Sequence, residues 1–576
     1  MLEFLGHIAE FLWGPWTMGA LLVAGILFTL WSRLTQVTAM THGIQVVRGV
    51  YDDPDDPGAI NHFQALSAAL SATVGLGNIG GVALAIGIGG PGALFWMWIV
   101  GFFGMALKTI EITLAMMYRN TDDPENPHGG AMWVVEKVIG GKGGIWQPIG
   151  RAIGVFFCVT LIISCFTGGN MSQSWSVANL TFDFFRWPKA FTGILLAVIV
   201  GLVIIGGIKR IGSVAGKLVP LMCVLYLLAA FGVLLANLTE IPSLLWLIVK
   251  SAFSPTEAAG AFVGGTVWYA FTLGMKRALF SNEAGQGSAP IAHAAAKTDE
   301  PAREGVVGGI GPFIDTICIC TITALVILST GTWNRPAMGD LAQPLVVTAG
   351  SDANEAWSVA GPEDVAALPA DQFGSWEKGD EFFVVANVIG ANHLDTADNK
   401  LALTGKIAAR PRGDKPAEAP DELFLQWNAA SVERFDGQVT AIEPTTGVYR
   451  KYDGANLTAH AFDRQFEGLG RYLVTLAAWL FAISTMISWS YYGEQGMVYM
   501  LGEKSVLPYK IVFLMGTIYA AAEIKKTDDM IILMDLGTGA MLWANLPIVL
   551  GLGYLAVNCL VDYNRRLKAG EFKKHK

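Results

Sequence analysis

Glycines interrupt an apolar segment in the N-terminal part of this chain. Residues 63–88 are apolar enough to form a membrane crossing, yet the middle of the segment reads SATVGLGNIGG and contains Gly75, Gly77, Gly80 and Gly81. Each glycine lowers helix propensity by about 1 kcal/mol, so we expect the helix to break there. Irregular backbone at membrane depth is tolerated only where it is buried in protein or lines a cavity. The glycines therefore predict either close helix packing or a binding site.

A broken crossing exposes backbone groups that bind charged ligands. The half-helix that begins at the break directs free N–H groups and a positive dipole end into the gap. These groups, at Gly75, Leu76 and Gly77, are suited to a carboxylate. The half-helix that ends at the break exposes carbonyl oxygens, which suit a small cation or an ammonium group. Asn78 adds a side-chain carbonyl to the same loop.

The composition places most of the chain in a lipid bilayer. Hydrophobic residues make up 53% of the 576 residues and charged residues only 15%, with a mean hydropathy of +0.45, whereas soluble domains carry about 25% charged residues. All six cysteines fall in apolar segments, so we expect buried thiols. No HExxH motif, GxSxG motif or metal-spaced cluster occurs. We therefore expect no enzymatic activity, and a lipid bilayer rather than a nucleic acid as partner.

Eleven windows of about 20 apolar residues are expected to form membrane helices. These windows lie at about 14–35, 63–88, 92–118, 150–178, 189–207, 213–236, 259–282, 306–330, 470–491, 506–522 and 530–560. A shorter apolar run, Leu244 to Ala252, is expected to form a helix on the surface. The pattern predicts an all-α membrane part that crosses the bilayer eleven times.

Basic residues in alternate loops predict how these helices are oriented, because Lys and Arg near helix ends mark the cytoplasmic side. They follow the first and ninth expected helices and lie between the third and fourth and between the fifth and sixth. They also flank the loop after the seventh, where Lys276 and Arg277 occur, and fill the tail. We therefore expect the C-terminus in the cytoplasm and the N-terminus outside, in a plasma membrane, specifically a bacterial inner membrane.

One long region, residues 332 to 467, contains no membrane segment. It holds 21 acidic and 11 basic side chains, which accounts for nearly all of the net charge of −9. The runs FFVVANVIG, LALTGKIAAR, ELFLQWNAA, GQVTAIE and GVYRKYDG are short, β-branched or aromatic, and separated by turn residues, which is typical of strands. We expect a small β-rich insert on the outer side, between membrane parts 1–331 and 468–576. Its acidity indicates a solvated surface, and ligand binding is the alternative.

After the first helix, the other ten expected helices divide into two sets of five. The broken crossing opens the first set, and the window 259–282 opens the second with Gly264, Gly265 and Gly274. Two interrupted segments at corresponding positions of two halves are typical of inverted-repeat transporters. An odd number of helices per half inverts the second copy. The sequence therefore predicts a 5+5 inverted repeat with one extra N-terminal helix.

Three long motifs resemble one known family. They are SATVGLGNIGGVALAI followed by GGPGALFWMW, then LFSNEAGQGSAPIAHAAAKTDEPAREG, and finally LFAISTMISWSYYGE. In this order they resemble the sodium:alanine/glycine symporter family. The resemblance implies a leucine-transporter-like fold preceded by one extra helix, which agrees with the count of eleven. It also implies Na⁺-coupled uptake of alanine, glycine or a similar small neutral amino acid.

The resemblance also implies residues for the ion and the substrate. Gln173, in GGNMSQSWSVAN, corresponds to a substrate-contacting glutamine, and bonding to a neighbouring helix is the alternative. Ser484 and Thr485 lie where this fold supplies hydroxyl ligands to Na⁺, although such hydroxyls also bond to their own helix. Ser71 and Val74 would donate the backbone carbonyls.

Three further residues are expected near the substrate. Trp489 lies one turn after Thr485 on the same helix face and resembles the family's pocket tryptophan; a tryptophan at the membrane interface is the alternative. Near the second break, Thr272 departs from the family's usual residue. Phe271 and Thr272 would then supply an aromatic contact and a hydroxyl to the site.

Ionisable residues at membrane depth are functional candidates, because burying them is costly. Lys108 and Glu111 are one turn apart and are expected to pair, whereas Asp315 and Asp535 have no partner in sequence. Glu283, near Lys276 and Arg277, is a candidate for an inner-gate ion pair, with a solvated helix end as the alternative.

Two other functions compete with Na⁺ symport. Coupling to H⁺ through a buried carboxylate is one. The other is a ligand sensor that uses the outer insert. A sensor needs a cytoplasmic effector, and the longest expected cytoplasmic segments of this chain, about 30 residues, are too short for such a domain.

Overall fold

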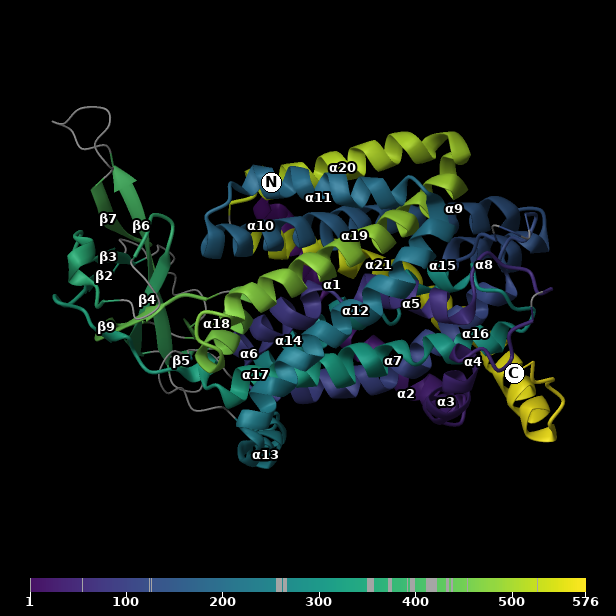
Figure 1. Cartoon of the computed structure of the whole chain (residues 1–576), viewed down its shortest axis with the longest axis horizontal. Coiled ribbons are helices and arrows are strands. Elements are labelled where there is room, and N and C mark those ends of the chain that lie inside the picture. Colours follow the sequence, from purple (N-terminus) through teal and green to yellow (C-terminus); the bar gives the residue numbers. More distant parts are fainter. Residues whose placement is uncertain are drawn as a thin grey trace.

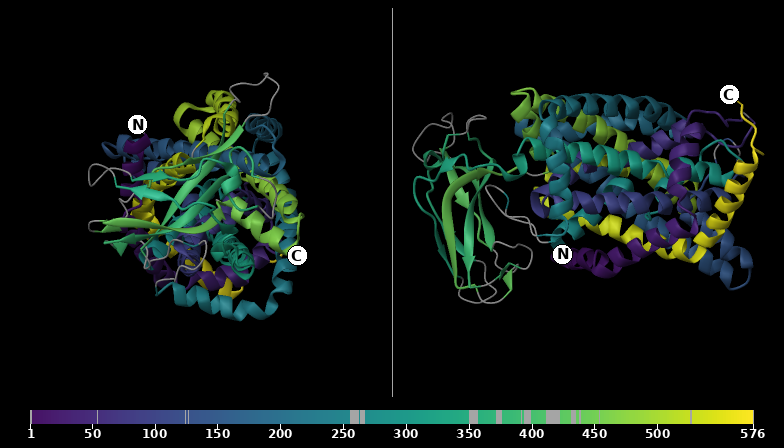
Figure 2. Two further views of the ribbon diagram at one scale, coloured as in Figure 1. Left: turned by 90° about the vertical axis from the view of Figure 1, so that its left-hand side faces the viewer. Right: turned by 90° about the horizontal axis from the view of Figure 1, so that it is seen from below.

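The chain forms a long bundle of helices with a small β unit at one end (Figure 1). The computed structural model describes every residue except 1, 54, 124, 126, 255–261, 263–266, 350–356, 371–375, 391, 394–398, 411–421, 431–434, 437–438, 453, 526 and 576. Most of the long helices run along the long axis of the molecule, and the strands lie across the end of the bundle (Figures 1 and 2).

The helices occur on both sides of the β unit in sequence. Before the strands come α1 (Leu2–Leu12), α2 (Pro15–Trp31), α3 (Thr35–Thr38), α4 (Ile44–Val47), α5 (His62–Thr73), α6 (Val82–Gly89), α7 (Gly92–Met117), α8 (Ala131–Val138), α9 (Trp146–Phe166), α10 (Ser172–Phe185), α11 (Lys189–Ile204), α12 (Gly207–Ala236), α13 (Ile241–Ser251), α14 (Val267–Asn282), α15 (Ala289–His293), α16 (Pro301–Gly308) and α17 (Cys320–Ser329). After the strands come α18 (Ala455–Gln465), α19 (Gly470–Leu501), α20 (Val506–Glu523) and α21 (Thr527–Ala569). Wider π-helical turns extend several of them, among them η2 (Gly77–Gly81), η4 (Thr167–Met171) and η6 (Phe313–Ile319).

Within the described residues, eight helical segments are long and apolar enough to cross a membrane, or nine if a bent pair forms one crossing. The bent pair is α5 with η2 and α6, which meet at 50°. The other two expected crossings coincide with α11 and α14, each 16 residues long as described. The expected surface run coincides with α13, whose Trp246 is exposed. The chain is therefore a polytopic, mostly helical membrane protein.

The first expected break is present at the predicted place. Asn61 and Gln64 form a capping box that starts α5. The helix ends at Thr73, and Val74 turns the chain with an extended ψ of 90°. The second half resumes as a π-helical turn at Gly77. The glycine cluster thus breaks the helix because the local propensity is low.

The second expected break lies only partly within the described residues. Gly274 lies inside the continuous helix α14, where its missing side chain lets α14 approach the backbone of Ala93 on α7. Gly264 and Gly265 lie outside the described residues. Gly274 therefore serves close helix packing.

Strands of the insert form one five-stranded antiparallel sheet in the order β1-β9-β4-β6-β7. Its strands are β1 (Gly339–Asp340), β4 (Glu381–Ile389), β6 (Lys400–Arg410), β7 (Glu422–Trp427) and β9 (Ala441–Arg450). Two small pairs join β2 (Val346–Thr348) to β3 (Ser358–Ala360) and β5 (Asn392–His393) to β8 (Phe435–Asp436). One face buries alternate residues such as Phe382, Val384 and Leu403 in a core of its own. The predicted β-rich insert is confirmed as a sheet.

Helix α18 lies in the range expected for the insert but packs on the helical bundle. The Thr458 hydroxyl donates a hydrogen bond to the carbonyl of Ile79 in η2, at 3.0 Å. Phe462 packs against Tyr226 of α12, with ring centroids 6.0 Å apart. The insert therefore returns to the bundle beside the broken helix.

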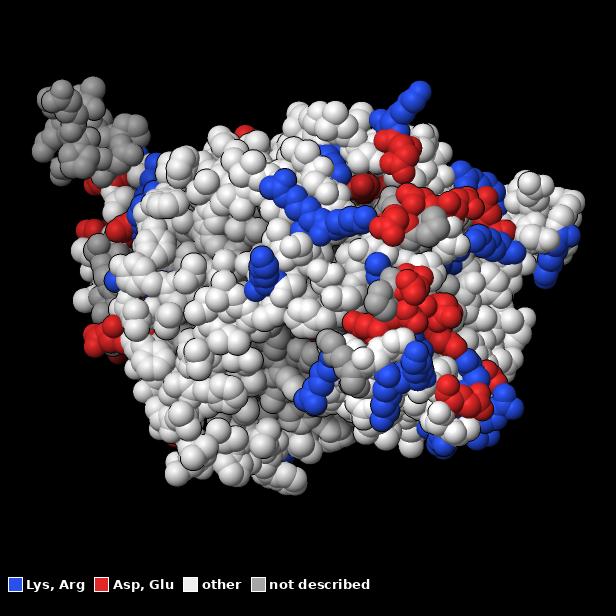
Figure 3. Space-filling view, turned by 45° about the vertical axis from the view of Figure 1, so that its right-hand side comes forward, with Lys and Arg blue, Asp and Glu red and all other residues white. Residues whose placement is uncertain are grey.

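The two termini lie at opposite ends of the bundle, with the N-terminus near the β unit (Figure 2). Charged side chains gather at the end away from the β unit, while much of the side of the bundle is uncharged (Figure 3). This distribution is that of a bundle whose sides face lipid and whose ends face water.

Candidate binding site

A cavity of about 760 Å³ runs from the insert to the break in the first broken helix. Leu76, Gly77, Gln173 and Phe280 line its deep end. The phenyl ring of Phe280 lies 3.1 Å from where a Cβ of Gly77 would be and 3.3 Å from where one of Gly168 would be. The broken helix, η4 and α14 therefore meet at the bottom of the cavity.

Two buried oxygens without a hydrogen-bond partner lie beside the break, within the part of the chain that is described. A Cβ placed on Gly75 would be 2.5 Å from Thr485 Oγ1 and 3.6 Å from Gln173 Oε1. No side chain larger than glycine fits there. The amide nitrogen of Gln173 is held by the Gly168 carbonyl at 3.2 Å, which turns Oε1 the other way. Unpaired buried acceptors are costly, so these oxygens indicate a place for a cation or an ammonium group.

The N–H groups of the break are only partly free. The Gly75 amide donates to Asn78 Oδ1 at 2.8 Å, so the side chain of Asn78 caps the turn. The expectation that the Gly75 N–H faces a ligand is therefore wrong for this arrangement. Leu76 and Gly77 remain on the cavity wall, as predicted.

The side chain of Asn78 links the break to two other helices. Its Nδ2 donates to Asp315 Oδ1 at 2.6 Å and to Ser281 Oγ at 3.1 Å. Asp315 Oδ2 accepts from Ser281 Oγ at 2.7 Å and from Thr316 Oγ1 at 2.9 Å. Asp315 is fully buried. This carboxylate therefore joins α5–η2, α14 and η6, and is a part of the site that sequence reasoning noted only as an unpaired acid.

Helix α19 lies along the half-helix that ends at the break. The Ser71 hydroxyl donates to the Ser484 carbonyl at 2.7 Å and lies 2.6 Å from the Ser484 hydroxyl. One turn further on, Ser488 Oγ donates to the Ala68 carbonyl at 2.9 Å. The structure thus brings Ser71 and Ser484 into contact, and Thr485 lies beside Gly75. Val74 is buried among them.

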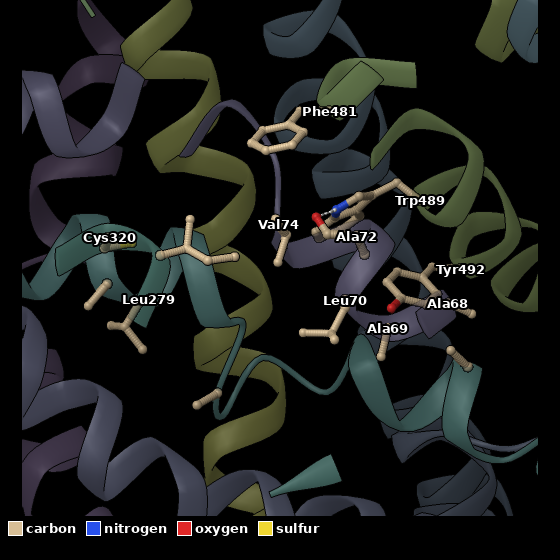
Figure 4. Packing of buried hydrophobic residues seen from close by; sticks show 14 of the residues in the cluster. Ala68, Ala69, Leu70, Ala72, Val74, Leu279, Cys320, Phe481, Trp489 and Tyr492 are labelled. Atoms are coloured by element: carbon tan, nitrogen blue, oxygen red, sulfur yellow. Dashed lines mark hydrogen bonds between the residues drawn. The ribbon is translucent and has the colours of Figure 1, made fainter. Parts of the chain in front are cut away.

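The indole of Trp489 lies behind this half-helix. Its Nε1 donates to the Ala72 carbonyl at 3.4 Å (Figure 4). A Cβ on Gly169 of η4 would lie 2.2 Å from Trp489 Cγ. The ring is buried between α5 and η4 and is absent from the cavity lining. Trp489 therefore supports the wall of the site and does not face its lumen.

Phe271 and Thr272 do not reach the cavity. The Thr272 hydroxyl donates to the carbonyls of Trp268 and Tyr269 on its own helix. Phe271 packs edge-on against Trp96 of α7, with centroids 4.9 Å apart. Neither residue is part of the cavity lining in this arrangement, so their expected contacts with a substrate stay a prediction.

The chain matches the sodium:alanine symporter family over residues 1–357 and 438–576. It belongs to this family. The unmatched residues, 358–437, contain β4, β6 and β7 of the five-stranded sheet. Family members are transporters, so this chain is a multi-pass transport protein and not an enzyme.

Named relatives of this symporter cover much of its length. The sodium/alanine symporter AgcS of Methanococcus maripaludis is 41% identical over 351 residues, which span 61% of this chain and 76% of AgcS. The probable sodium/glutamine symporter GlnT of Bacillus subtilis is 36% identical over 347 residues, 59% of this chain and 69% of GlnT. The putative sodium/proton-dependent alanine carrier protein YrbD of Bacillus subtilis is 28% identical over 574 residues, 99% of this chain and 94% of YrbD.

Buried charges of the symporter have other partners than expected. Lys108 Nζ donates to the Asn282 carbonyl at 2.8 Å, whereas Glu111 accepts from Asn545 Nδ2 at 3.1 Å. Lys108 and Glu111 therefore do not pair directly. Glu283 accepts from the Ser288 hydroxyl at 2.5 Å, inside its own loop. These contacts hold the turn after α14.

The expected ion pair of Glu283 with Lys276 and Arg277 is also wrong. Lys276 Nζ lies 3.3 Å from one carboxylate oxygen of Asp535, and Arg277 Nη2 lies 3.9 Å from the other. Both basic residues are on α14, one to two turns before its end, and Arg277 lines the cavity. Arg277 therefore belongs to the wall of the site, and Lys276 lies next to it on the same helix.

Ion pairs join the insert to the mouth of the cavity. Arg186, at the end of α10, contacts Glu377 at 2.5 Å and Asp380 at 3.6 Å. Asp380 also pairs with Arg450 of β9 at 2.5 Å. Nearby in α18, burial and three arginines (Arg335, Arg464 and Arg450) lower the pKa of His460 to about 3, so its imidazole is neutral at neutral pH. The insert therefore covers the mouth of the cavity. Of its residues named here, Glu377 and Asp380 lie outside the ranges that match the family, and Arg450 lies inside them.

Replacing Arg186 with alanine should loosen this cover without unfolding the helices. Partly exposed ion pairs contribute about 0–1 kcal/mol each, so thermal stability should change little. In contrast, a membrane-impermeant thiol reagent should modify a cysteine placed at Ser176, on the cavity wall, several-fold faster. Arg410→Ala, which breaks the pair of Arg410 with Glu422 inside the insert, is the control. Equal rates in both backgrounds would show that the cover does not depend on Arg186.

Proposed function

We propose that this symporter imports alanine, glycine or a similar small neutral amino acid together with Na⁺ by alternating access. The observation that carries the proposal is the pair of unpaired buried oxygens, Thr485 Oγ1 and Gln173 Oε1, beside Gly75 at the bottom of the cavity. Two acceptors without donors are suited to a cation and an ammonium group. The names of AgcS and YrbD, which include sodium and alanine, support the same choice.

Na⁺ is proposed to bind where α5 ends against α19. The backbone carbonyls of Ser71 and Val74 and the hydroxyls of Ser484 and Thr485 are the proposed ligands. Carbonyls at the end of a broken helix coordinate Na⁺ in other inverted-repeat transporters. Ser71 and Ser484 already touch each other, so the ion would replace one hydrogen bond and tie the two helices together.

The amino acid is proposed to bind at the deep end of the cavity. Its carboxylate would meet the positive end of the second half-helix at Leu76 and Gly77. Its ammonium group would meet Gln173. Trp489 would limit the size of the side chain indirectly, by holding η4 in place. The close approach of Phe280 to Gly77 leaves little room, which supports a small substrate.

The topology of the chain is part of the proposal. We propose eleven crossings, arranged as a leucine-transporter-like 5+5 inverted repeat after one extra N-terminal helix. The N-terminus would lie outside and the C-terminus in the cytoplasm of a bacterial inner membrane. The position of the termini at opposite ends of the bundle supports this arrangement (Figure 2). The cavity would then open outward, below the insert.

Coupling to H⁺ is the second candidate, favoured by one observation. Asp315 is a fully buried carboxylate in direct contact with the break through Asn78. A proton on Asp315 would remove its charge and weaken its hold on Asn78. The name of YrbD includes both sodium and proton dependence.

Uptake into proteoliposomes tests both candidates. Labelled alanine should accumulate when an inward Na⁺ gradient is imposed and not when K⁺ replaces Na⁺. Accumulation that ignores Na⁺ but follows an inward pH gradient would favour H⁺ coupling. Absence of uptake under both gradients, for alanine and for glycine, would contradict the proposed substrates.

Thr485→Val should raise the Na⁺ concentration needed for half-maximal uptake at least tenfold. The substitution removes one hydroxyl ligand and keeps the shape of the side chain. Uptake at saturating Na⁺ should fall much less. Thr475→Val is the matched control, because Thr475 is also a buried, unpaired threonine of α19 but lies more than two turns from the break. An unchanged Na⁺ dependence in Thr485→Val would exclude this hydroxyl as a ligand.

A further inference from the structure

Arg277, on the cavity wall, shares its acidic partner with the neighbouring Lys276. Lys276 and Arg277 share the single carboxylate of Asp535, at 3.3 and 3.9 Å. The side chain of Arg277 is only 4% exposed. Its Nε is buried and has no hydrogen-bond partner among the described residues. A buried guanidinium with an unused donor is costly, so its position calls for an anionic partner.

Arg277 lies next to the second half of the broken helix. Its Cδ is 3.7 Å from where a Cβ of Gly81 would be, and both residues line the cavity. Gly81 ends the π-helical turn η2, in the first turns of the half-helix that carries the positive dipole end. The guanidinium and the helix end therefore add their positive fields at one wall, about one turn above Phe280.

Acidic side chains toward the mouth of the cavity are engaged by other groups. Asp183 accepts from Asn456 Nδ2 at 2.6 Å. Asp380 is held by Arg450, and Glu381 by Lys451 at 2.8 Å. These acids are therefore satisfied without Arg277, whose own acid, Asp535, is shared with Lys276.

We propose that Arg277 is a specificity-determining residue that binds the carboxylate of the substrate. This inference rests on the proposed amino-acid transport and deepens it. The planar guanidinium presents paired donors that match a carboxylate. An amino acid entering the cavity meets Arg277 before it reaches the break. The residue therefore selects molecules with a carboxylate over neutral amides and amines of the same size.

The test compares alanine with alaninamide, which has the same side chain and ammonium group but no carboxylate. Both compete against labelled alanine for Na⁺-driven uptake by wild type, Arg277→Gln and Arg277→Lys. We expect Arg277→Gln to raise the KM for alanine at least tenfold and to lower the preference for alanine over alaninamide by a similar factor. Arg277→Lys, which keeps the charge, should retain part of that preference.

Arg471→Gln is the matched control, because Arg471 also lines the cavity and has a buried, unpaired Nε but lies near the insert. It should leave the preference unchanged. A preference in Arg277→Gln equal to that of wild type would overturn the inference and make Arg277 a structural ion-pair residue.

Uptake by the wild-type protein distinguishes a failure of this inference from a failure of the proposed function. If the wild-type protein shows no Na⁺-driven uptake of alanine, the proposed function is contradicted, whatever the variants do. Stabilisation of the detergent-purified proteins against heat, by small amino acids and by their amides, then measures the preference directly. If Arg277→Gln does not yield folded protein, Arg277→Lys and Arg277→His are measured in its place. A preference equal to that of wild type in both of these variants would contradict a bidentate guanidinium contact.

Discussion

Asp315→Ala should reduce Na⁺-driven alanine uptake at least 100-fold. The substitution removes the acceptor of Asn78 Nδ2 and of the Ser281 hydroxyl, both deep in the bundle. Hydrogen bonds to charged groups contribute about 1.5–3 kcal/mol each. Asn78, which also caps the Gly75 amide, would keep its bonds to the Ser281 hydroxyl and to the main-chain carbonyl at position 315. The break would then be held less firmly against α14 and η6.

Asp315→Asn separates the hydrogen bonds from the charge. An asparagine at this position accepts from Asn78 with its oxygen and donates to Ser281 with its nitrogen, so the shape of the break is kept. If Asp315 only positions the break, this variant should retain uptake well above that of Asp315→Ala. If it carries a coupled proton, both variants should lose uptake driven by a pH gradient.

The measurement is initial uptake in proteoliposomes with equal amounts of folded protein, judged by size-exclusion chromatography. Asp183→Asn is the control, because Asp183 is a carboxylate of the same cavity that accepts from Asn456 near the insert. Its uptake should stay within about threefold of wild type, since only a partly exposed hydrogen bond of about 0.5–1.5 kcal/mol changes. Full activity of Asp315→Ala would exclude the link through Asn78.

Of the substitutions that add one methyl group in this site, Gly169→Ala should lower the stability of the protein most. The new Cβ would lie 2.2 Å from Trp489 Cγ and 2.4 Å from Trp489 Cβ. The indole cannot retreat easily, because its Nε1 is bonded to the Ala72 carbonyl and its ring is buried. Overpacking of this kind costs about 1–3 kcal/mol or more. We expect a clearly lower melting temperature and uptake below a tenth of wild type.

Thermal unfolding of the detergent-purified protein, followed by tryptophan fluorescence, measures the effect. Gly19→Ala in α2 is the control, because no atom of the other described residues beyond its own helix turn lies within 4 Å of its Cβ position and alanine favours the helix. Trp489→Ala destabilises the protein by itself, because it leaves a cavity. The double variant should therefore lose less stability than the sum of the two single losses, since the clash is absent once the indole is removed. Additive losses would show that the contact between Trp489 and η4 is not the cause.

Local sequence patterns were sufficient to predict where helices and strands of this fold lie. The long apolar windows coincide with helices because a backbone in lipid must satisfy its own hydrogen bonds. The cluster from Gly75 to Gly81 predicted the break, since glycine lowers helix propensity wherever it stands. Short runs of β-branched or aromatic residues separated by turn residues predicted β4, β6 and β9 for the same kind of local reason.

Gly274 shows where local reasoning misleads. Gly274 lowers helix propensity just as Gly75 does, yet α14 continues through it, because the absent side chain allows the helix to press against Ala93 of α7. A glycine in a sequence does not tell which of these two uses it serves. Phe271 and Thr272 were expected at the site because they lie near this glycine, and in the continuous helix neither residue lines the cavity.

The chemistry of the site depends on contacts that are remote in sequence. Asn78 meets Asp315, and Arg277 meets Asp535, through packing of helices that the chain visits far apart. The only signal in the sequence was that an ionisable residue inside the membrane is costly and needs a partner. It marked Asp315 and Asp535 but not their partners.

The sequence by itself indicated which segments are apolar enough to enter a membrane, where the first of the broken segments is interrupted and which family the chain resembles, because hydropathy and glycine content act locally. Only the tertiary structure decided that Asn78 caps the break, that Arg277 stands at the cavity wall and that the insert covers the mouth. Those arrangements follow from how helices pack against one another, and that packing is set by side chains on several elements at once.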